Sequence, residues 1–290
     1  MPQVTLKNYL SLVKFSHTIF AMPFAVVGFL IALKTNHAPL EWSLFVKVLL
    51  CMLFARNSAM AFNRWADREF DKRNPRTFVR EIPSGVISAN AALFFVIGNC
   101  LLFVATTYFI NPICFYLSPI ALVVVLGYSL TKRFTPLCHI ILGLGLSLAP
   151  IGAYLAVTGV FDMLPLYFSF AVLFWSSGFD IIYALQDEEF DRSQKLLSIP
   201  VVMGTRNAMR LSNLLHFLTG VFLIIPGIVG DFGLYYFIGS GIFCCLLFYQ
   251  HTLVKHNDLT KVNLAFFTLN GIASVIFALF FILEFYFGNK

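Results

Sequence analysis

The sequence predicts an all-α membrane protein, and three observations indicate this fold class. Hydrophobic residues make up 59% of the 290 positions and charged residues only 12%, against roughly half and a quarter in soluble domains. Apolar stretches recur along the whole chain, each near the roughly 20 residues that a helix needs to cross a bilayer. The alternation of apolar and polar residues that marks barrel strands is absent. We therefore expect a polytopic helical bundle forming a single transmembrane domain over residues 1–290.

Nine stretches are long and apolar enough to be membrane-spanning helices. They cover residues 17–35, 41–62, 89–109, 112–131, 137–157, 164–185, 211–230, 233–253 and 263–286. The first stretch has a basic flank, but no small-residue cleavage pattern follows it, so we expect it to remain as a helix. Prolines within several stretches are compatible with membrane spans because neighbouring helices repair the backbone at a kink.

The basic residues are distributed unevenly between the two sides of the predicted spans. Arg56 lies within a span; with it set aside, 16 of the 20 Lys and Arg residues fall on the side of the N-terminus and three on the other. The positive-inside rule assigns the more basic side to the cytoplasm. We therefore expect a protein surrounded by lipid in the inner cell membrane, with its N-terminus and basic loops in the cytoplasm. Topology accounts for the basic charge without nucleic-acid binding.

Nine of the fourteen acidic residues lie in two segments, at the cytoplasmic ends of two predicted spans. They are Asp67, Glu69, Asp71 and Glu81 in the first segment, and Asp180, Asp187, Glu188, Glu189 and Asp191 in the second. Residues four apart share one face of a helix. This spacing groups Asn63, Asp67 and Asp71 in one column and Tyr183, Asp187 and Asp191 in another, with Asp180 seven residues before Asp187. Each segment thus predicts a helix face lined with oxygen ligands.

Two acidic columns at one membrane face require a cation between them. Like charges four apart on a helix repel, and the repulsion grows where the dielectric is low. Mg²⁺ prefers oxygen ligands, takes one or two carboxylates and completes its shell with water and phosphate oxygens. We therefore predict a Mg²⁺ site that binds a diphosphate, with nearby cations on the remaining phosphate oxygens. These cations are Arg68, Lys72, Arg73, Arg76, Arg80, Arg192 and Lys195. Ordinary solvated loops are the alternative, which two matched columns disfavour.

The acidic segments resemble motifs of the UbiA superfamily of intramembrane aromatic prenyltransferases. The first column, followed by the sequence R-E-I-P-S-G at Arg80–Gly85, is similar to that family's first aspartate motif. The second segment resembles its D-x-x-Y-x-x-x-D-x-x-x-D motif, and Tyr128 with Lys132 resembles its Y-x-x-x-K element. The likeness covers the full chain, including the order of nine helices. Two positions depart from the family: Arg64, where Asp is common, and Glu81, where Pro is frequent.

The resemblance implies an enzyme that transfers a polyprenyl group from its diphosphate to an aromatic acceptor. It implies that Mg²⁺ is held by the motif residues Asn63, Asp67, Asp71, Asp187 and Asp191. The four aspartates among them would also be catalytic. Tyr128 and Lys132 would fix the diphosphate. We expect further substrate-binding roles for Arg68, Arg80, Asp180, Tyr183 and Lys195. The allylic carbocation formed on loss of diphosphate would be shielded from water in an apolar, Phe-rich cavity.

The acceptor is indicated by Arg56, which lies seven residues before Asn63 and thus two turns deeper on the same face. A charged side chain within a span is a candidate functional residue. In the ubiquinone branch of the family, an arginine at this offset is associated with the carboxylate of the aromatic acid. This favours a 4-hydroxybenzoate-like acceptor, with Arg56 in the substrate-binding set; a snorkelling arginine is the alternative. The segment around His17 resembles the opening of the 4-hydroxybenzoate and related menaquinone-pathway branches, or His17 is a packing residue.

Other functions stay open at this point. Within the family, a hydroxynaphthoate of menaquinone biosynthesis would also fit a carboxylate-binding arginine, and haem O or chlorophyll synthesis is possible. The motif of CDP-alcohol phosphotransferases is absent. A membrane transporter with cytoplasmic acidic sites is the alternative from another class. Transporters place their ionisable residues along a path at the membrane midplane, whereas here they lie at helix ends.

Overall fold

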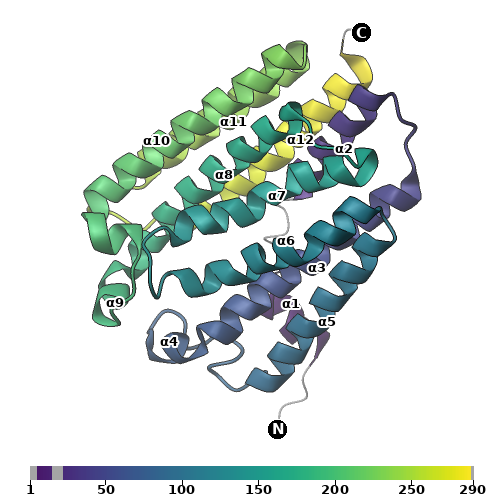
Figure 1. Ribbon diagram of the computed structural model, residues 1–290. Coiled ribbons are helices and arrows are strands. Elements are labelled where there is room, and N and C mark those ends of the chain that lie inside the picture. The colour runs from purple at the N-terminus through teal and green to yellow at the C-terminus, as the bar shows by residue number, and fades with distance from the viewer. Residues whose placement is uncertain (1–4, 15–21, 289–290) are drawn as a thin grey trace.

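The computed structural model describes residues 5–14 and 22–288, and this part of the chain folds almost entirely into helices (Figure 1). The long helices are α2 (Met22–Asn36), α3 (Trp42–Ala66), α5 (Ala89–Tyr108), α6 (Pro112–Thr131), α7 (Cys138–Thr158), α8 (Met163–Ala184), α10 (Ile199–Val229), α11 (Leu234–Leu253) and α12 (Asn270–Phe287). The short elements are α1 (Leu6–Leu12), α4 (Arg68–Arg73), the 3₁₀ turn η2 (Leu185–Asp187), α9 (Glu188–Ser193) and the π-helical turn η3 (Leu264–Leu269). No β-strand occurs within the described ranges.

The predicted polytopic helical bundle is confirmed. Eight helices in the described residues are long and apolar enough to cross a membrane, and α2 is a shorter apolar helix. Residues 15–21, which include His17 and the start of the first predicted stretch, lie outside the described residues. α10 begins at Ile199, twelve residues before the stretch predicted from residue 211. The predicted stretch was shorter because residues 199–210 include two arginines and are less apolar than a membrane span. Gly204 interrupts its first turns with φ 75° and ψ 155°, a conformation available essentially only to glycine.

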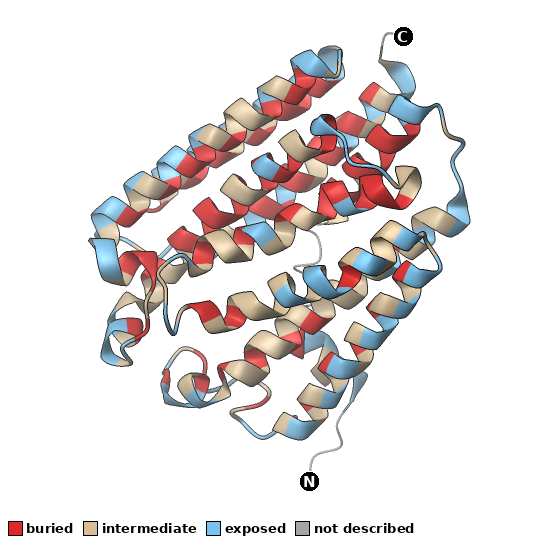
Figure 2. Ribbon diagram, viewed as in Figure 1, coloured by how far each residue is buried: buried red, intermediate tan, exposed pale blue. Residues whose placement is uncertain are grey.

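The core lies among α2, α7, α8, α10, α11 and α12. Buried aromatic side chains such as Phe24, Phe168, Trp175 and Phe277 fill it. Figure 2 shows buried residues concentrated on the inner helices, whereas the outer helices expose much of their surface. Large apolar side chains are exposed on those outer faces, for example Phe94 on α5. Such a surface suits lipid, which solvates apolar side chains as well as a protein interior does.

Close approach of α2 to α7 depends on Gly28. A Cβ atom at this position would collide with the backbone carbonyl group of Pro150 in α7. Small residues allow membrane helices to approach closely, and the dispersion contacts so gained hold the helices together. This contact joins α2, the first long helix, to the wall of the cavity described below.

Candidate active site

Each acidic segment includes a point where a long helix breaks. α3 ends at Ala66, and Asp67, with φ −93° and ψ 5°, separates it from α4. α8 ends at Ala184, and Asp187, with φ −107° and ψ 3°, closes the turn η2 before α9. The predicted columns are therefore not faces of continuous helices. In the first segment, the helical spacing of four residues is kept across the break, because the Asp67 N–H donates to Asn63 O (3.0 Å) and the Asp71 N–H to Asp67 O (2.8 Å).

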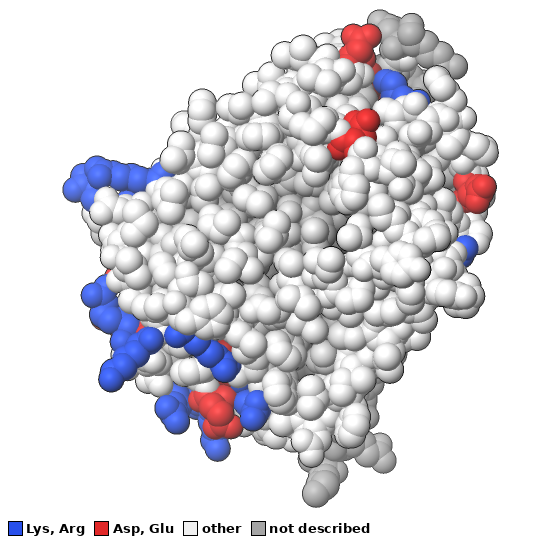
Figure 3. Space-filling view, in the orientation of Figure 1, with Lys and Arg blue, Asp and Glu red and all other residues white. Residues whose placement is uncertain are grey.

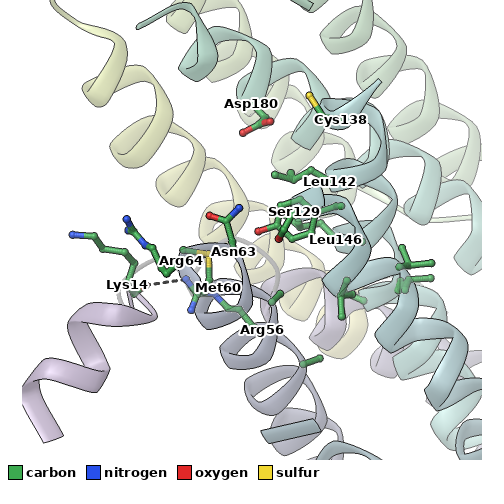
Figure 4. A pocket seen from close by; sticks show the side chains of 18 of the residues that line it. Lys14, Arg56, Met60, Asn63, Arg64, Ser129, Cys138, Leu142, Leu146 and Asp180 are labelled. Carbon is green, nitrogen blue, oxygen red and sulfur yellow. Dashed lines mark hydrogen bonds between the residues drawn. The ribbon is translucent and has the colours of Figure 1, made fainter. Parts of the chain in front are cut away.

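The two segments meet at one end of a single large cavity of about 1110 Å³. Polar residues line that end, including Asn63, Asp67, Asp71, Tyr128, Lys132, Asp180, Tyr183, Asp187 and Asp191. Apolar residues of α3, α6 and α7 line the remainder, among them Val48, Leu117, Val124, Leu142 and Leu146. Figure 4 shows Met60 and Asn63 of α3 on one side of this space and Ser129, Leu142 and Leu146 on the other. The cavity thus combines one charged end with a long apolar interior.

Asp67 is paired with basic residues that follow α6. Its side chain is almost completely buried, and its Oδ2 lies 2.9 Å from Lys132 Nζ. Arg133 Nη2 lies 3.5 Å from its Oδ1 and donates to the carbonyl of Ala66 (2.7 Å). Burial would lower the pKa of Lys132, but the Asp67 carboxylate outweighs this effect and raises that pKa above its ordinary value. Lys132 is therefore a fixed positive charge at the polar end of the cavity.

Only one of the two carboxylate oxygens of Asp71 has a hydrogen-bond partner among the described residues. Arg80 Nη1 donates to its Oδ1 at 2.7 Å, and Thr77 Oγ1 donates to its backbone carbonyl at 3.2 Å. Its Oδ2 is buried and has no hydrogen-bond partner among the described residues. A buried carboxylate oxygen without a donor is costly, so this atom is suited to a ligand or cation that the cavity admits.

Arg76 connects the two acidic segments. It follows α4 in the chain, yet its Nε donates to Asp187 Oδ1 at 3.0 Å and its Nη2 pairs with Asp187 Oδ2. Its Nη1 donates to the hydroxyl of Tyr183 (2.8 Å), and Asn74 Nδ2 donates to Asp187 Oδ1 (3.2 Å). Burial would lower the pKa of Arg76, but its hydrogen bond to Asp187 raises that pKa. The guanidinium therefore stays charged and holds the ends of α4 and α8 together.

A histidine that sequence reasoning missed supports Asp180. His139, near the start of α7, donates from Nδ1 to Asp180 Oδ2 at 2.7 Å. The backbone nitrogen of Ile199 lies 3.4 Å from its Nε2. No spacing in the sequence links residues 139 and 180, so only the packing of α7 against α8 reveals this pair.

The carboxylates suit an oxygen-liganded cation, although no group of three His, Cys, Asp or Glu side chains in the described ranges is arranged to hold a metal. Instead Asp67, Asp71 and Asp187 each pair with a cationic side chain. Mg²⁺ needs only one or two protein carboxylates, with water and substrate phosphates completing its shell. The unpartnered Oδ2 of Asp71 and the hard oxygen donors around it fit such an ion.

Two residues of the predicted substrate-binding set lie apart from the cavity. Arg68 stacks on the Trp65 ring, 4.9 Å from its centroid, and donates to the Trp65 carbonyl at 2.8 Å. Lys195 is exposed beyond α9, with φ 56°. Neither lines the cavity. Arg80 does line it, and so do the other predicted side chains named above.

Arg56 lines the cavity, as its position in α3 predicted, and two of its N–H groups donate to backbone carbonyls of the N-terminal segment. Nη1 donates to the carbonyl of Val13 at 2.9 Å and Nη2 to that of Lys14 at 2.8 Å. The guanidinium thus caps the carbonyl end of α1, and Figure 4 shows it beside Lys14. In this arrangement Arg56 anchors the N-terminal segment at the edge of the cavity.

Comparison with known proteins identifies the family. Residues 21–272 match the UbiA prenyltransferase family. The chain belongs to this family. A UbiA homolog from Aeropyrum pernix K1, solved in the apo state, superposes with a TM-score of 0.84 at 27% identity, over 92% of this chain and 98% of that one. The UbiA resemblance drawn from the motifs is thereby confirmed.

Relatives in the UbiA family extend the comparison. The 4-hydroxybenzoate octaprenyltransferase of Francisella tularensis subsp. novicida (strain U112) is 30% identical over 246 residues, 83% of this chain and 85% of the relative. The enzyme of the same name from Aeromonas hydrophila is 28% identical, over 85% of both chains. A UbiA homolog from Archaeoglobus fulgidus bound to DMAPP and Mg²⁺ shares the fold, with a TM-score of 0.75 at 22% identity over 96% of this chain and 99% of that one.

Proposed function

We propose that the protein transfers a polyprenyl group from polyprenyl diphosphate to an aromatic acid, 4-hydroxybenzoate or a close analogue, in quinone biosynthesis. The observation that carries this proposal is the single cavity with paired acidic and basic side chains at one end and apolar walls beyond them. A prenyl diphosphate has the same division into a charged head and an apolar tail. The related 4-hydroxybenzoate octaprenyltransferases support the choice of acceptor.

At the polar end, the motif residues would hold the diphosphate head together with Mg²⁺. The ion's proposed ligands are Asn63, Asp67, Asp71, Asp187 and Asp191. When bound, Mg²⁺ supplies positive charge that stabilises the departing diphosphate. Lys132 and Arg80 already lie within hydrogen-bond distance of Asp67 and Asp71, so they are placed to donate to phosphate oxygens as well. Preorganised donors of this kind stabilise charge that develops in a transition state.

The apolar part of the cavity would bind the prenyl chain and exclude water. The C–O bond to the diphosphate breaks with both electrons leaving on oxygen, and the allylic carbocation that remains is attacked by the aromatic ring. A new C–C bond forms, and the ring then loses a proton. The walls reach from the motif aspartates to Val48 near the start of α3 and Phe161 beyond α7. This depth suits a long prenyl chain.

We further propose that the polar end faces the cytoplasm of a cell with this protein in its inner membrane. In Figure 3, Lys and Arg side chains gather at the end of the molecule where Figure 1 places α4 and α9. The positive-inside rule supports this orientation. Single cysteines placed in residues 72–80 should react with a membrane-impermeant thiol reagent only from the cytoplasmic side. Labelling from the other side would overturn the proposed topology.

The decisive experiment incubates purified protein in nanodiscs with Mg²⁺, geranyl diphosphate and one acceptor at a time. We expect 4-hydroxybenzoate to yield a product heavier by one geranyl group less one hydrogen, with release of diphosphate. Product only from a hydroxynaphthoate would move the acceptor to menaquinone biosynthesis. Absence of product from every aromatic acceptor, combined with uptake of an anion into proteoliposomes, would favour the transporter.

A further inference from the structure

A π-helical turn lies in the wall of the cavity. η3 (Leu264–Leu269) precedes α12, and its residues Phe266 and Phe267 both line the cavity. Turns of this kind are rare in helices and are frequent at functional sites. Consecutive side chains of a regular helix point in different directions. Here both rings contact Tyr183, with centroids 4.2 and 5.9 Å from that of the Tyr183 ring.

Tyr183 connects this turn to the polar end of the cavity. Its hydroxyl accepts from Arg76 Nη1 at 2.8 Å, and the same guanidinium pairs with Asp187. Its ring packs against Phe266 at an interplanar angle of 30°, and aromatic pairs of this kind have a preferred geometry. A displacement of Phe266 should therefore move the hydroxyl group that holds Arg76 beside Asp187.

Asn270, the first residue of α12, holds the turn from outside the cavity. Its Nδ2 donates to the backbone carbonyls of Ala265 and Phe266, at 3.0 and 3.1 Å. Asparagine side chains can compete in this way with the backbone hydrogen bonds of a helix. The Asn270 side chain is completely buried and does not line the cavity. It can therefore influence the reaction only through the residues that it holds.

The side-chain amide of Asn270 is itself fixed by two other helices. Trp175 of α8 donates from Nε1 to Asn270 Oδ1 at 2.7 Å, and Gln250 of α11 accepts at Oε1 from Asn270 Nδ2 at 3.2 Å. Since an indole N–H can only donate, the oxygen of the amide faces Trp175 and the nitrogen faces the turn. Trp175 and Gln250 are also completely buried. A buried network of hydrogen bonds is rigid, so Asn270 has a fixed position from which to hold the turn.

We infer that Asn270 is a positioning residue for prenyl transfer: it holds η3 so that Phe266 fixes Tyr183, and Tyr183 in turn fixes Arg76 beside Asp187. This inference rests on the proposed function, in which Asp187 belongs to the diphosphate end of the cavity. It assigns no contact with a substrate to Asn270. An asparagine that only stabilised the bundle would lower the unfolding temperature when replaced, and would leave the kinetic constants of the folded protein unchanged.

The test is a double-mutant cycle measured in nanodiscs with Mg²⁺, geranyl diphosphate and 4-hydroxybenzoate. Asn270→Ala and Phe266→Leu should each lower kcat/KM for geranyl diphosphate about 10- to 100-fold, because a shift of catalytic groups by about 1 Å has an effect of that order. Effects of residues that act through one another do not add. Asn270→Ala should therefore change kcat/KM by less than about threefold when Phe266 is already leucine.

Asn99→Ala is the matched control. Asn99 is a buried asparagine of α5 that donates from Nδ2 to the carbonyl of Phe95, four residues earlier, at 2.8 Å. It does not line the cavity. Its replacement removes the same side chain from a regular helix, so kcat/KM should stay within about threefold of the wild type, the limit set for an uncoupled site.

Hydrogen exchange supplies a readout that does not depend on turnover. Residues 264–269 should exchange faster in Asn270→Ala than in the wild type and in Asn99→Ala. If the alanine variant does not fold, Asn270→Asp takes its place, because aspartate keeps the acceptor for Trp175 and removes the amide donor. Losses of kcat/KM that multiply in the double variant would overturn the inference, as would wild-type kcat/KM in the folded Asn270 variant. If the wild type itself prenylates no aromatic acid, the proposed function fails, whereas exchange in residues 264–269 still tests whether Asn270 holds the turn.

Discussion

Arg76 holds Asp187 through two nitrogens of one guanidinium, joining the loop after α4 to the end of α8 across 111 positions of sequence. A fork of this kind fixes both distance and angle between its partners. Since Asp187 belongs to one acidic segment and Arg76 follows the other, the pair sets the separation of the two segments.

The first prediction concerns this fork. Arg76→Lys retains the charge but loses the two-point contact with Asp187 and the bond to Tyr183. We expect kcat/KM for prenyl transfer to fall about 10- to 100-fold, because misplacement of the catalytic groups by about 1 Å has an effect of that order. Arg73→Lys, which changes an exposed neighbour that contacts Gln194, is the control and should remain near wild type. Equal activity of the two variants would show that the fork has no part in placing the site.

The second prediction concerns the metal. Asp67→Ala and Asp191→Ala should each lower kcat at least about 100-fold, a typical loss for a group that stabilises transition-state charge. EDTA should abolish activity, and Mg²⁺ should restore it. Asp258→Asn, a change in an exposed loop, controls for general effects of removing a carboxylate. Full activity of the wild type in EDTA would contradict the assignment of these residues to a Mg²⁺ site.

The third prediction concerns the N-terminal helix. Arg56 donates to the carbonyls of Val13 and Lys14 at the end of α1, so Arg56→Ala should release this segment. Hydrogen exchange measured by mass spectrometry should show loss of protection in residues 6–14, with protection of α8 unchanged. Lys47→Ala is the control, because Lys47 lies on the same helix but contacts Phe109. Wild-type protection of α1 in Arg56→Ala would show that the contact does not hold the helix.

The membrane helices could be predicted from sequence because a run of apolar residues long enough to span lipid leaves the backbone little choice but to form a helix. The polar columns could be predicted for a related reason, since helical spacing decides which side chains share a face. Both inferences use only neighbours in sequence. They are less accurate where a helix breaks, as at Asp67 and Asp187, or extends into polar sequence, as α10 does beyond Arg206.

The partners of the motif carboxylates could not be predicted from spacing. His139 reaches Asp180 and Arg76 reaches Asp187 only because distant helices pack together. The same limit applies to Arg56, whose position in the cavity was predicted but whose contacts with α1 were not. Arg64 was visible in the sequence only as a departure from the family motif. That it is buried, with no hydrogen bond to its Nε and Nη1 among the described residues, follows from the packing around it.

The last prediction concerns Glu284, a buried carboxylate at the opposite end of the bundle from the motif aspartates. Its Oε1 accepts from the Gly233 N–H at 2.7 Å and its Oε2 from the Tyr236 N–H at 3.3 Å, so it caps the first turn of α11. The free N–H groups and the dipole of a helix N-terminus favour a negative charge there. Glu284→Ala leaves these donors unsatisfied inside the protein and should reduce the free energy of unfolding by about 1–3 kcal/mol. Glu284→Gln keeps an acceptor but loses the charge, so it should be less destabilising.

Glu41→Ala is the control, because Glu41 precedes α3 without a side-chain capping bond. Unfolding temperatures measured in one detergent should be highest and equal for the wild type and Glu41→Ala, lower for Glu284→Gln and lowest for Glu284→Ala. Prenyl transfer by the folded variants should be unchanged. A Glu284→Ala protein as stable as the Glu41→Ala control would contradict this role.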